Sequence, residues 1–453
     1  MKEYDVVVIG AGDVGLGIVF NALSDGRSVA LIEKGNVGGT CVNVGCVPSK
    51  TLTFVADRVM EIREAAKLGI MADIREIDFV SVMKRMREAV DSGRNSIKKA
   101  LESSKDLDFY HNEGRFVDDY TLEIGGDRIK GGRVFIASGT RPFIPPIKGL
   151  SDLAYLTNEN LLELDRRPDS IIIVGGGYIG VEYAHFFEAV GSKVTVVERG
   201  PVLAFHEEPE ISELLEKKLR ERMNVFTDTE VVEVRREKEG YTATVRSDER
   251  GAENLRGGAI LVAVGRKSNA DILEVEKTGV KTDKATFIKV NDYLETDKEN
   301  IWALGDAIGR QMFTHAGDKE AEVAWHNATH KEKLKMDFMD VPHAVFTWPQ
   351  IASVGLTERE ARKSQAVLVG KAMYYDTVKG TAMVEREGFA KAVVEKETGR
   401  ILGFHIIGPH APILVQEVVN AMVHENGISY IRGSMHIFPA LSDLITETLE
   451  NLE

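Results

Sequence analysis

The two cysteines of this chain, Cys41 and Cys46, are its clearest candidates for chemistry. They are the only cysteines among 453 residues, and both lie in the segment GGTCVNVGCVPSK at residues 38–50. Two thiols are too few for a disulfide framework, and a structural zinc site takes four ligands. A disulfide closing so short a loop would add little stability. The pair is therefore predicted to do redox chemistry, with one thiolate attacking a substrate and the other facing a redox cofactor.

The surroundings of the cysteines favour ionised thiols. The residues from Val42 to Lys50 are predicted to begin a helix, and the dipole at a helix N-terminus stabilises a thiolate. Lys50 follows Cys46 by four residues, so a regular helix would place its positive charge on the same face. Paired cysteines can also be small apolar core residues, but a glycine-rich turn favours the redox role.

A glycine turn near the N-terminus predicts the element that positions the cysteines. An apolar run at residues 6–9 leads into Gly10, Gly12 and Gly15, a helical pattern follows, and a second strand ends at Glu33. This order is typical of dinucleotide-binding folds, where backbone N–H groups approach the pyrophosphate and the acid binds a ribose. The cysteine segment follows Glu33 closely, so it is expected beside the first nucleotide.

The same pattern recurs in the segment SIIIVGGGYIGVEYAHFFEAVGSKVTVVER. It contains Gly175, Gly177 and Gly180 after a strand, and Glu198 after the next strand. The chain is therefore predicted to bind two dinucleotides. A carboxylate at the position of Glu198 accepts from a ribose 2′-OH and repels a 2′-phosphate, so NAD(H) is expected rather than NADP(H), although Arg199 is adjacent.

These segments predict an α/β fold with two Rossmann-like dinucleotide-binding domains and a C-terminal α+β domain. The first dinucleotide domain is expected in two parts, with a helical segment at 51–104 in the first of them. The predicted limits are 1–145 and 265–335 for this domain, 146–264 for the second dinucleotide domain, and 336–453 for the C-terminal domain.

The composition excludes several partners. The formal net charge of −14 argues against nucleic acid, whose phosphates require a basic face, and against an anionic membrane surface. The longest apolar runs have the length of strands, and the start MKEYDVVVIGAG runs directly into a strand with no targeting pattern. A cytoplasmic protein without a metal site is expected.

The motifs together resemble one family along the whole chain. They are VVVIGAGDVG with Glu33, GGTCVNVGCVPSK, ASGTRP, VGGGYIGVE, AVGRKSN, WALGDAIG, FTWPQIASVG and FPALSD. The chain resembles the flavoprotein pyridine nucleotide–disulfide oxidoreductases, which include dihydrolipoamide dehydrogenase, glutathione reductase, mycothione reductase and mercuric reductase. The resemblance implies FAD on the first dinucleotide fold, a nicotinamide nucleotide on the second, and a homodimer whose subunits complete each other's active sites.

The resemblance also implies roles for individual residues. Cys46 would lie next to the flavin, and Cys41 would be the interchange thiol that meets a small-molecule disulfide or dithiol, the two forming a redox disulfide. Lys50 and Glu182 would pair near the flavin N5. The residues expected to contact FAD are Gly10, Gly12, Gly15, Glu33, Lys34, Gly39, Thr40, Lys50, Gly114, Ser138, Gly139, Thr140, Arg141, Asp306, Thr314, His315 and Ala316. Those expected around NAD(H) are Gly175, Gly177, Gly180, Glu198 and Gly265, with Tyr178 or Ile179 lining the nicotinamide pocket.

One segment, SMHIFPALSDLI, departs from the family. The disulfide reductases carry His-Pro here with a Glu five residues after the His, and the imidazole is the acid–base partner of the interchange thiol. This chain has Phe438 before Pro439, and Asp443 in the place of the Glu. A phenyl ring cannot transfer a proton. The nearest substitute is His436, which on an extended backbone would point to the same side as position 438, or which is a surface or interface histidine.

Three functions are consistent with this departure. The first is an NADH-dependent disulfide or dithiol oxidoreductase similar to dihydrolipoamide dehydrogenase, passing electrons between NAD(H), FAD and a Cys41–Cys46 disulfide. The second is an enzyme like 2-oxopropyl-coenzyme M reductase/carboxylase, where Phe and His replace the His–Glu pair and the missing proton donor lets a carbanion meet CO2. The third is a flavoprotein that relays electrons to a protein or quinone partner.

Overall fold

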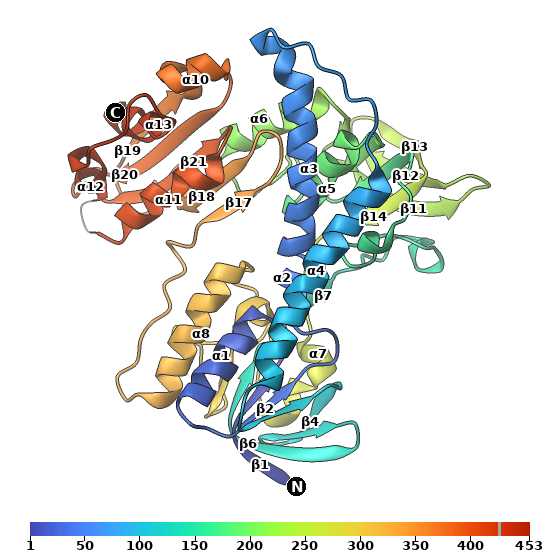
Figure 1. The fold of residues 1–453 in the computed structure, drawn as a ribbon, viewed down its shortest axis with the longest axis vertical. Helices are drawn as coiled ribbons and strands as arrows, with labels where there is room; N and C mark the ends of the chain where they lie inside the picture. Colours follow the sequence, from blue (N-terminus) through green and yellow to red (C-terminus); the bar gives the residue numbers. More distant parts are fainter. Residues whose placement is uncertain (425–426) are drawn as a thin grey trace. The chain divides into compact units, whose positions relative to one another are not determined.

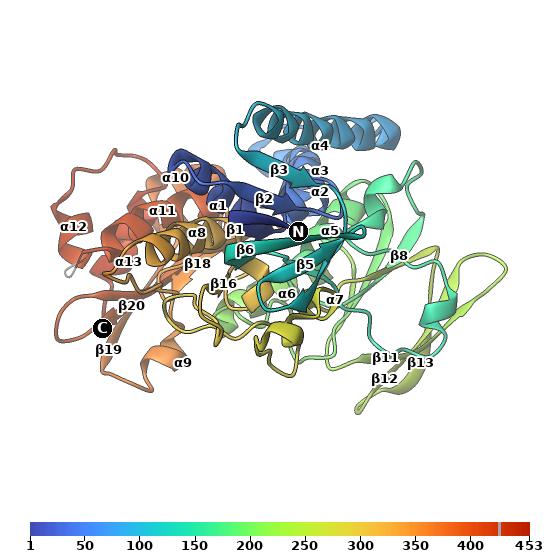
Figure 2. The ribbon, with the colours of Figure 1, turned by 90° about the horizontal axis from the view of Figure 1, so that it is seen from below.

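The computed structural model describes residues 1–424 and 427–453, and the chain separates into two compact units (Figures 1 and 2). The first unit contains residues 1–51, 84–143 and 265–338. The second unit contains residues 52–83, 144–264 and 339–453. Two of the borders, after residues 51 and 83, fall inside the long helices α3 (Cys46–Glu64) and α4 (Phe79–Glu102), which account for most of the predicted helical segment 51–104.

The first unit is built on a mixed sheet whose strand order is β3-β2-β1-β6-β5-β4, with β16 also paired to β6. Strand β1 lies in parallel between β2 and β6, with Val6 opposite Val29 and Ile9 opposite Ile32. The strands are β1 (Lys2–Ile9), β2 (Val29–Ile32), β3 (Leu107–Tyr110), β4 (Gly114–Asp118), β5 (Thr121–Ile124), β6 (Asp127–Ile136) and β16 (Ile301–Ala303). All four residues of β2 are buried, as expected for a strand inside a parallel sheet.

Helices α1 (Asp13–Ser24) and α8 (Thr314–Thr329) of this unit pack side by side (Figure 1). The remaining short elements are α2 (Gly39–Val44), α7 (Ala270–Leu273), η4 (Val275–Thr278), η5 (Gly305–Ile308) and a ribbon of β7 (Thr140–Pro142) with β15 (Arg266–Ser268). Loops at Gly10, Glu33, Ala137 and Leu304 leave the carboxyl ends of four parallel strands. Ligands of open α/β sheets bind at that edge.

The second unit holds a smaller parallel sheet in the order β10-β9-β8-β14. Its strands are β8 (Ser170–Val174), β9 (Lys193–Val197), β10 (Asn224–Phe226) and β14 (Ala259–Val262), joined by α5 (Tyr178–Ala189) and α6 (Pro209–Arg220). An antiparallel sheet accompanies it, formed by β11 (Glu230–Arg236), β12 (Tyr241–Ser247) and β13 (Gly251–Gly257). Single helical turns lie at η1 (Ala65–Leu68), η2 (Leu150–Asp152) and η3 (Asn160–Glu163).

The C-terminal part of the second unit is an antiparallel sheet in the order β17-β18-β21-β20-β19. Its strands are β17 (His343–Val345), β18 (Ile351–Gly355), β19 (Val367–Met373), β20 (Phe389–Glu395) and β21 (Ile401–Ile407). Its helices are α9 (Glu358–Ala361), η6 (Tyr374–Asp376), α10 (Val378–Met383), α11 (Ala411–Met422), α12 (Gly427–Gly433) and α13 (Asp443–Glu450). Side chains alternate between the two faces of each strand, so Ala352 and Phe404 join the core beneath α11 and α13, whereas Ser353, Lys391 and His405 point to the opposite face.

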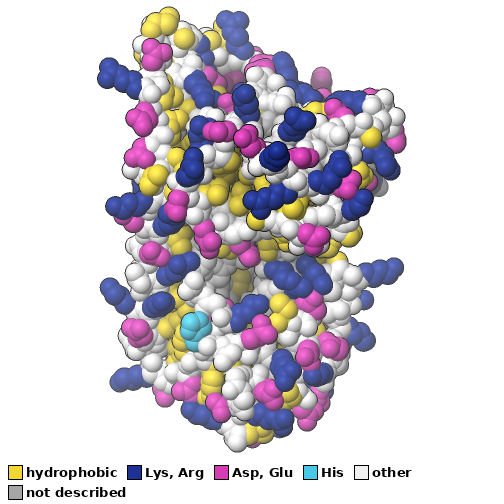
Figure 3. Space-filling view, turned by 90° about the vertical axis from the view of Figure 1, so that its right-hand side faces the viewer, with side chains coloured by type: hydrophobic (Ala, Val, Ile, Leu, Met, Phe, Trp, Pro, Cys, Tyr) yellow, Lys and Arg dark blue, Asp and Glu magenta, His cyan; other side chains and the backbone are white. Residues whose placement is uncertain are grey.

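The predicted fold class is confirmed by these two parallel nucleotide-type sheets and the C-terminal α+β domain. Within the described residues, no helix is long and apolar enough to cross a membrane. On the face drawn in Figure 3, basic and acidic side chains are interspersed rather than gathered by sign.

Candidate active site

The two cysteines lie on separate helices that meet at Gly45. Cys41 is in α2, and Cys46 is the first residue of α3. The predicted start of the helix at Val42 is therefore wrong. Helix α2 already begins at Gly39, and the helical conformation is interrupted at Gly45 before α3 begins. A β-carbon at Gly45 would lie 2.8 Å from the carbonyl oxygen of Thr40, so a larger residue would push the two cysteine-bearing turns apart. The break places Cys46 at a helix N-terminus, where the dipole favours a thiolate.

Cys46 is exposed and Cys41 is partly buried, and both are free thiols in the structure. A hydrogen bond donated by Cys41 lowers the pKa of Cys46 to about 6, helped by the Thr314 hydroxyl and the charge of Lys50 and opposed by burial. The same hydrogen bond, together with burial, raises the pKa of Cys41. The Thr314 hydroxyl lies 3.6 Å from the Cys46 sulfur. Near pH 7 the pair therefore holds one proton, on Cys41, and one thiolate, on Cys46.

We expect alkylation of the reduced protein to reveal this thiolate. Because the pKa of Cys46 is lowered to about 6, its rate of modification by iodoacetamide should fall only as the pH drops through about 6, whereas an ordinary thiol loses reactivity below its pKa of 9.0. Mass spectrometry of the modified peptide measures this rate. Cys41→Ser keeps a hydroxyl donor, so the pH at which the alkylation rate of Cys46 is half its maximum should stay low. Cys41→Ala removes the donor and should shift this midpoint to higher pH. Equal midpoints in these two variants would contradict the role of the Cys41 hydrogen bond.

The first glycine turn lies where the sequence predicts it, between β1 and α1. Gly10 has φ of +107°, and a β-carbon there would lie 2.2 Å from the carbonyl oxygen of Ala137, so the tight turn requires glycine. Glu33 accepts hydrogen bonds from the backbone N–H groups of Ala11 (2.9 Å) and Gly35 (2.6 Å). Its carboxylate is thus held at the carboxyl end of β2, the position from which such an acid binds a ribose.

A polar network at the same edge of the sheet contains several predicted FAD contacts. Asp306 accepts a hydrogen bond from the Thr140 hydroxyl at 2.8 Å, and Arg266 donates to the same hydroxyl at 2.6 Å. The Ser138 hydroxyl is buried and has no hydrogen-bond partner among the described residues. A buried hydroxyl left without a partner is costly, so a polar ligand at this edge would satisfy it. These groups fit the phosphate and sugar oxygens of a dinucleotide.

The other predicted FAD residues belong to this unit but differ in their surroundings. Arg141 is paired with Asp271 (2.7 Å), and Lys34 with Glu113 (3.7 Å). Thr40 lies 3.4 Å from the Arg266 guanidinium. Thr314, His315 and Ala316 form the first turn of α8, and the remaining glycines lie in turns, at element ends or in the first turn of a helix: Gly12, Gly15, Gly39, Gly114 and Gly139. Gly265, which was predicted around NAD(H), also belongs to this unit and precedes β15. Arg266 and Asp271 were not predicted, although the motif AVGRKSN contains Arg266.

The second glycine turn repeats the geometry of the first within the second unit. Gly175 has φ of +109°, and Gly177 and Gly180 follow at the start of α5. Glu198 accepts from the backbone N–H groups of Gly176 and Gly200, both at 2.6 Å, as Glu33 does in the first turn. Tyr178 and Ile179 are the first two residues of α5. The matching geometry supports a second dinucleotide at this turn.

Two predicted catalytic residues lie in different units. Lys50 belongs to the first unit and Glu182 to the second, so their pairing stays a prediction. Glu182 is buried on α5 and accepts a hydrogen bond from the backbone N–H of Phe346 at 3.0 Å.

The segment that departs from the family contains Phe438, His436 and Asp443. Phe438 is 73% exposed. His436 turns inward instead, with Nε2 2.5 Å from the Glu417 carboxylate and Nδ1 3.2 Å from the Ser434 carbonyl oxygen. Both ring nitrogens therefore face acceptors within their own chain. Asp443 accepts from the backbone N–H of Ala440 at 3.2 Å, at the start of α13.

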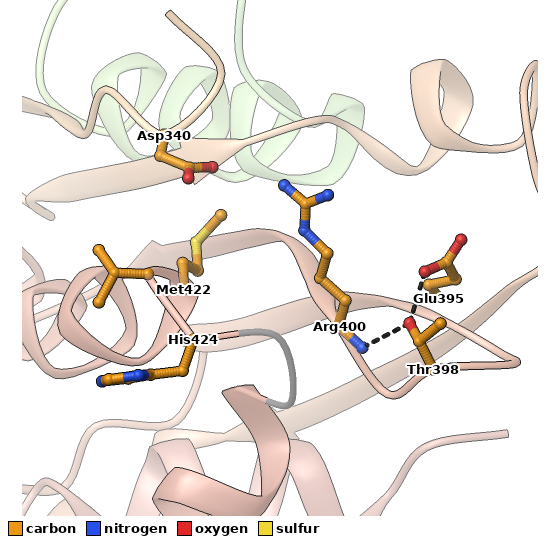
Figure 4. A pocket seen from close by; sticks show the side chains of 7 residues that line it. Asp340, Glu395, Thr398, Arg400, Met422 and His424 are labelled. Atoms are coloured by element: carbon orange, nitrogen blue, oxygen red, sulfur yellow. Dashed lines mark hydrogen bonds between the residues drawn. The ribbon is translucent and has the colours of Figure 1, made fainter. Parts of the chain in front are cut away.

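An open pocket of about 580 Å³ lies in the C-terminal domain, and none of the predicted site residues lines it (Figure 4). Its lining residues are Asp340, Glu395, Thr398, Arg400, Met422, Val423 and His424. Among the described residues there is no cluster of three or more side chains suited to a metal ion.

Two nucleotide-type folds, a cysteine pair between two helices and a C-terminal α+β domain define a flavoprotein disulfide oxidoreductase. Residues 4–329 match the family described as pyridine nucleotide-disulphide oxidoreductase, and residues 341–449 match the dimerisation domain of that family. The chain belongs to this family. It is therefore an enzyme that depends on FAD and a pyridine nucleotide and acts on a sulfur group, and its C-terminal domain is of the type that forms homodimers in the family.

Several characterised proteins resemble the chain along most of its length. It is 34% identical to mycothione reductase of Mycobacterium tuberculosis over 100% of both chains, and 32% identical to dihydrolipoyl dehydrogenase of Synechocystis over 98% of both. It is 35% identical to mercuric reductase of Lysinibacillus sphaericus, covering 90% of this chain and 75% of that one. The Cu(II) complex of the HOCl-induced flavoprotein disulfide reductase RclA from Escherichia coli has a TM-score of 0.88 at 27% identity, covering 99% of both chains.

Proposed function

We propose that this chain is an NADH-dependent FAD enzyme that exchanges electrons between NAD(H) and a small-molecule disulfide or dithiol through Cys41 and Cys46. The observation that carries the proposal is the cysteine pair itself: one thiolate at the N-terminus of α3, hydrogen-bonded by the other thiol, in the unit that holds the first glycine turn. Gly10, Glu33, Ser138 and Asp306 would hold FAD, which would supply the two-electron redox chemistry that links the nicotinamide to the cysteine disulfide.

The two thiols divide the exchange between them. Cys41 first passes its proton to the adjacent Cys46 thiolate, which already accepts a hydrogen bond from it. The Cys41 sulfur then attacks a substrate disulfide, which forms a mixed disulfide and releases a thiolate that takes the proton from Cys46. The Cys46 thiolate attacks the Cys41 sulfur, closes the Cys41–Cys46 disulfide and releases a second thiolate, which takes its proton from solvent. The proton transfer between the two cysteines would replace a step that the family assigns to histidine.

The preference for NADH over NADPH rests on Glu198. A carboxylate held at the end of β9 accepts from a ribose 2′-OH and repels a 2′-phosphate. We expect Glu198→Arg to raise the ratio of kcat/KM for NADPH over NADH by at least about tenfold. Glu198→Gln keeps the size of the side chain and serves as its control. Wild-type enzyme that uses NADPH as efficiently as NADH would contradict the proposed preference.

A second function is favoured by the surroundings of Phe438. Both ring nitrogens of His436 face acceptors, and Asp443 accepts a backbone hydrogen bond at the start of α13, which weighs against either residue passing a proton to a leaving thiolate. An enzyme that passes electrons to a quinone or a protein partner needs no such donor. The carboxylating function, which exploits the missing donor, is the third possibility.

A substrate panel on the NADH-reduced enzyme distinguishes these functions. Oxidised lipoamide, small disulfides, quinones, and a thioether ketone with bicarbonate are offered in turn, and the oxidation of NADH is followed. Rapid turnover with a disulfide supports the first function. Turnover with quinones alone supports the relay, and carboxylated product supports the third.

A further inference from the structure

A row of polar side chains crosses the C-terminal sheet on the face opposite α11. The cross-strand neighbours place one such residue on each of the five strands. In spatial order they are His343, Ser353, His405, Lys391 and Lys371. Each strand is otherwise largely apolar, so a polar row on a covered face requires partners.

Four of these residues have as partners three glutamates of the segment HEEPE, residues 206–210, which leads into α6, whereas His405 Nε2 lies 3.0 Å from the Leu356 carbonyl oxygen. Glu207 receives hydrogen bonds from His343 (2.7 Å) and Ser353 (2.6 Å). Glu208 pairs with Lys391 at 3.2 Å, and Glu210 pairs with Lys391 and Lys371. The segment is thereby fixed to the C-terminal sheet by charged groups, of which Glu207, Glu208 and Lys391 are buried, whereas Glu210 and Lys371 are partly exposed.

Glu207 differs from the other two glutamates because it also contacts the nucleotide-binding helix. The Tyr178 hydroxyl donates to Glu207 at 2.6 Å, and the ring of His343 stacks on the Tyr178 ring with centroids 5.6 Å apart. The Glu207 side chain is fully buried. Burial opposes its ionisation, but the hydrogen bonds from His343, Ser353 and Tyr178 outweigh it and hold the pKa of Glu207 at about 2. The Tyr178 hydroxyl therefore donates its hydrogen bond to a carboxylate that stays ionised at neutral pH.

Tyr178 is the first residue of α5, directly after the glycine turn at which the dinucleotide pyrophosphate is expected. We infer that Glu207 is a positioning residue for the nicotinamide nucleotide, which fixes Tyr178 beside the second glycine turn and ties that site to the C-terminal sheet. The inference rests on the proposed binding of NAD(H) at this turn. Glu207 itself need not touch the nucleotide, because it acts through the tyrosine ring.

The neighbouring residue Glu208 offers a matched control for Glu207. Both carboxylates are buried, adjacent in sequence and bonded to the same sheet, but only Glu207 contacts Tyr178. A role limited to holding the segment in place would make Glu207→Gln and Glu208→Gln equivalent. The variants Glu207→Gln, Glu208→Gln, Tyr178→Phe and the double variant Tyr178→Phe/Glu207→Gln therefore form the test set, each prepared with FAD bound.

We expect Glu207→Gln and Tyr178→Phe each to raise the dissociation constant of NAD⁺, measured by calorimetry, and the KM for NADH by at least about tenfold. The change in kcat should be much smaller, because the tyrosine acts on binding rather than on the chemical step. The double variant should be no weaker than either single variant, since both remove one contact. Glu208→Gln should lower the melting temperature and leave both constants unchanged.

Equal effects of Glu207→Gln and Glu208→Gln on NAD⁺ binding would overturn the inference, as would a change in melting temperature alone or additive effects in the double variant. Failure of the proposed function looks different. In that case the wild-type enzyme itself shows no NAD⁺ binding in calorimetry.

Discussion

Replacing Cys41 by serine is expected to lower disulfide turnover by at least about a thousandfold, because the nucleophile that forms the mixed disulfide is lost. Reduction of the bound FAD by NADH should remain fast, since Cys41 has no part in that step. Stopped-flow absorbance separates the reduction of FAD, measured with NADH alone, from disulfide turnover, measured with NADH plus disulfide. A variant that turns over disulfides as the wild type does would remove Cys41 from the reaction.

Cys46→Ser is the matched variant and should differ in its spectrum. A thiolate beside a flavin gives a long-wavelength absorption band. Cys41→Ser should show this band without any reductant, because Cys46 cannot form a disulfide and its pKa is lowered to about 6. Cys46→Ser should lack the band at every pH. Absence of the band from both Cys41→Ser and the NADH-reduced wild type would place Cys46 away from the flavin.

Phe438→His is expected to raise the turnover of lipoamide-type disulfides, because it supplies the acid–base group that the family uses. Such groups contribute about a hundred- to ten-thousandfold, which sets the upper range of the gain. The gain in turnover is limited by the carboxylate that must orient the new imidazole. Asp443 is one methylene shorter than the glutamate of the family, and it already accepts a hydrogen bond from the backbone N–H of Ala440. The double variant Phe438→His/Asp443→Glu should therefore gain more than the single one.

Phe438→Ala is the control for the loss of the aromatic ring, and it should bring no gain. Steady-state oxidation of NADH with oxidised lipoamide measures all of these variants. The expectation fails if the wild-type enzyme already turns over lipoamide as fast as NADH reduces its FAD. The proton would then have to come from the cysteine pair or the substrate.

The nucleotide turns could be predicted from sequence because their determinants are local. Gly10 and Gly175 hold conformations that favour glycine, and each turn is followed by an acid at the end of the next strand, Glu33 or Glu198. Strand, turn, helix and acid all lie within about thirty residues. The cysteine pair was equally visible, because cysteine occurs nowhere else in the chain.

The polar row of the C-terminal sheet could not be predicted in the same way. Ser353, Lys391 and His405 are far apart in sequence, and only strand register brings them side by side. Each does leave a signal, which is one polar residue inside an apolar strand, but that signal does not identify Glu207 or Glu208 as partners. The break at Gly45 was missed because helical spacing alone does not reveal the close approach of Thr40.

His436 shows a further limit of sequence patterns. Its spacing from position 438 suggested a substitute acid–base group, but its environment depends on Glu417 of α11, nineteen residues upstream. A ring with acceptors at both nitrogens fastens the segment after α12 to that helix. The role of His436 in proton transfer stays a prediction, and its hydrogen bonds weigh against it.

Glu33 and Glu198 each bridge two backbone N–H groups of their own turns, one of them twenty-two residues upstream. Both turns are therefore preorganised by side chains that also belong to the binding site. The conformational entropy of ordering them is lost when the chain folds rather than when a nucleotide arrives, which leaves more of the contact energy for affinity. A redesign of nucleotide preference at Glu198 thus alters the scaffold together with the specificity, and a new hydrogen-bond acceptor must be supplied for the N–H groups of Gly176 and Gly200.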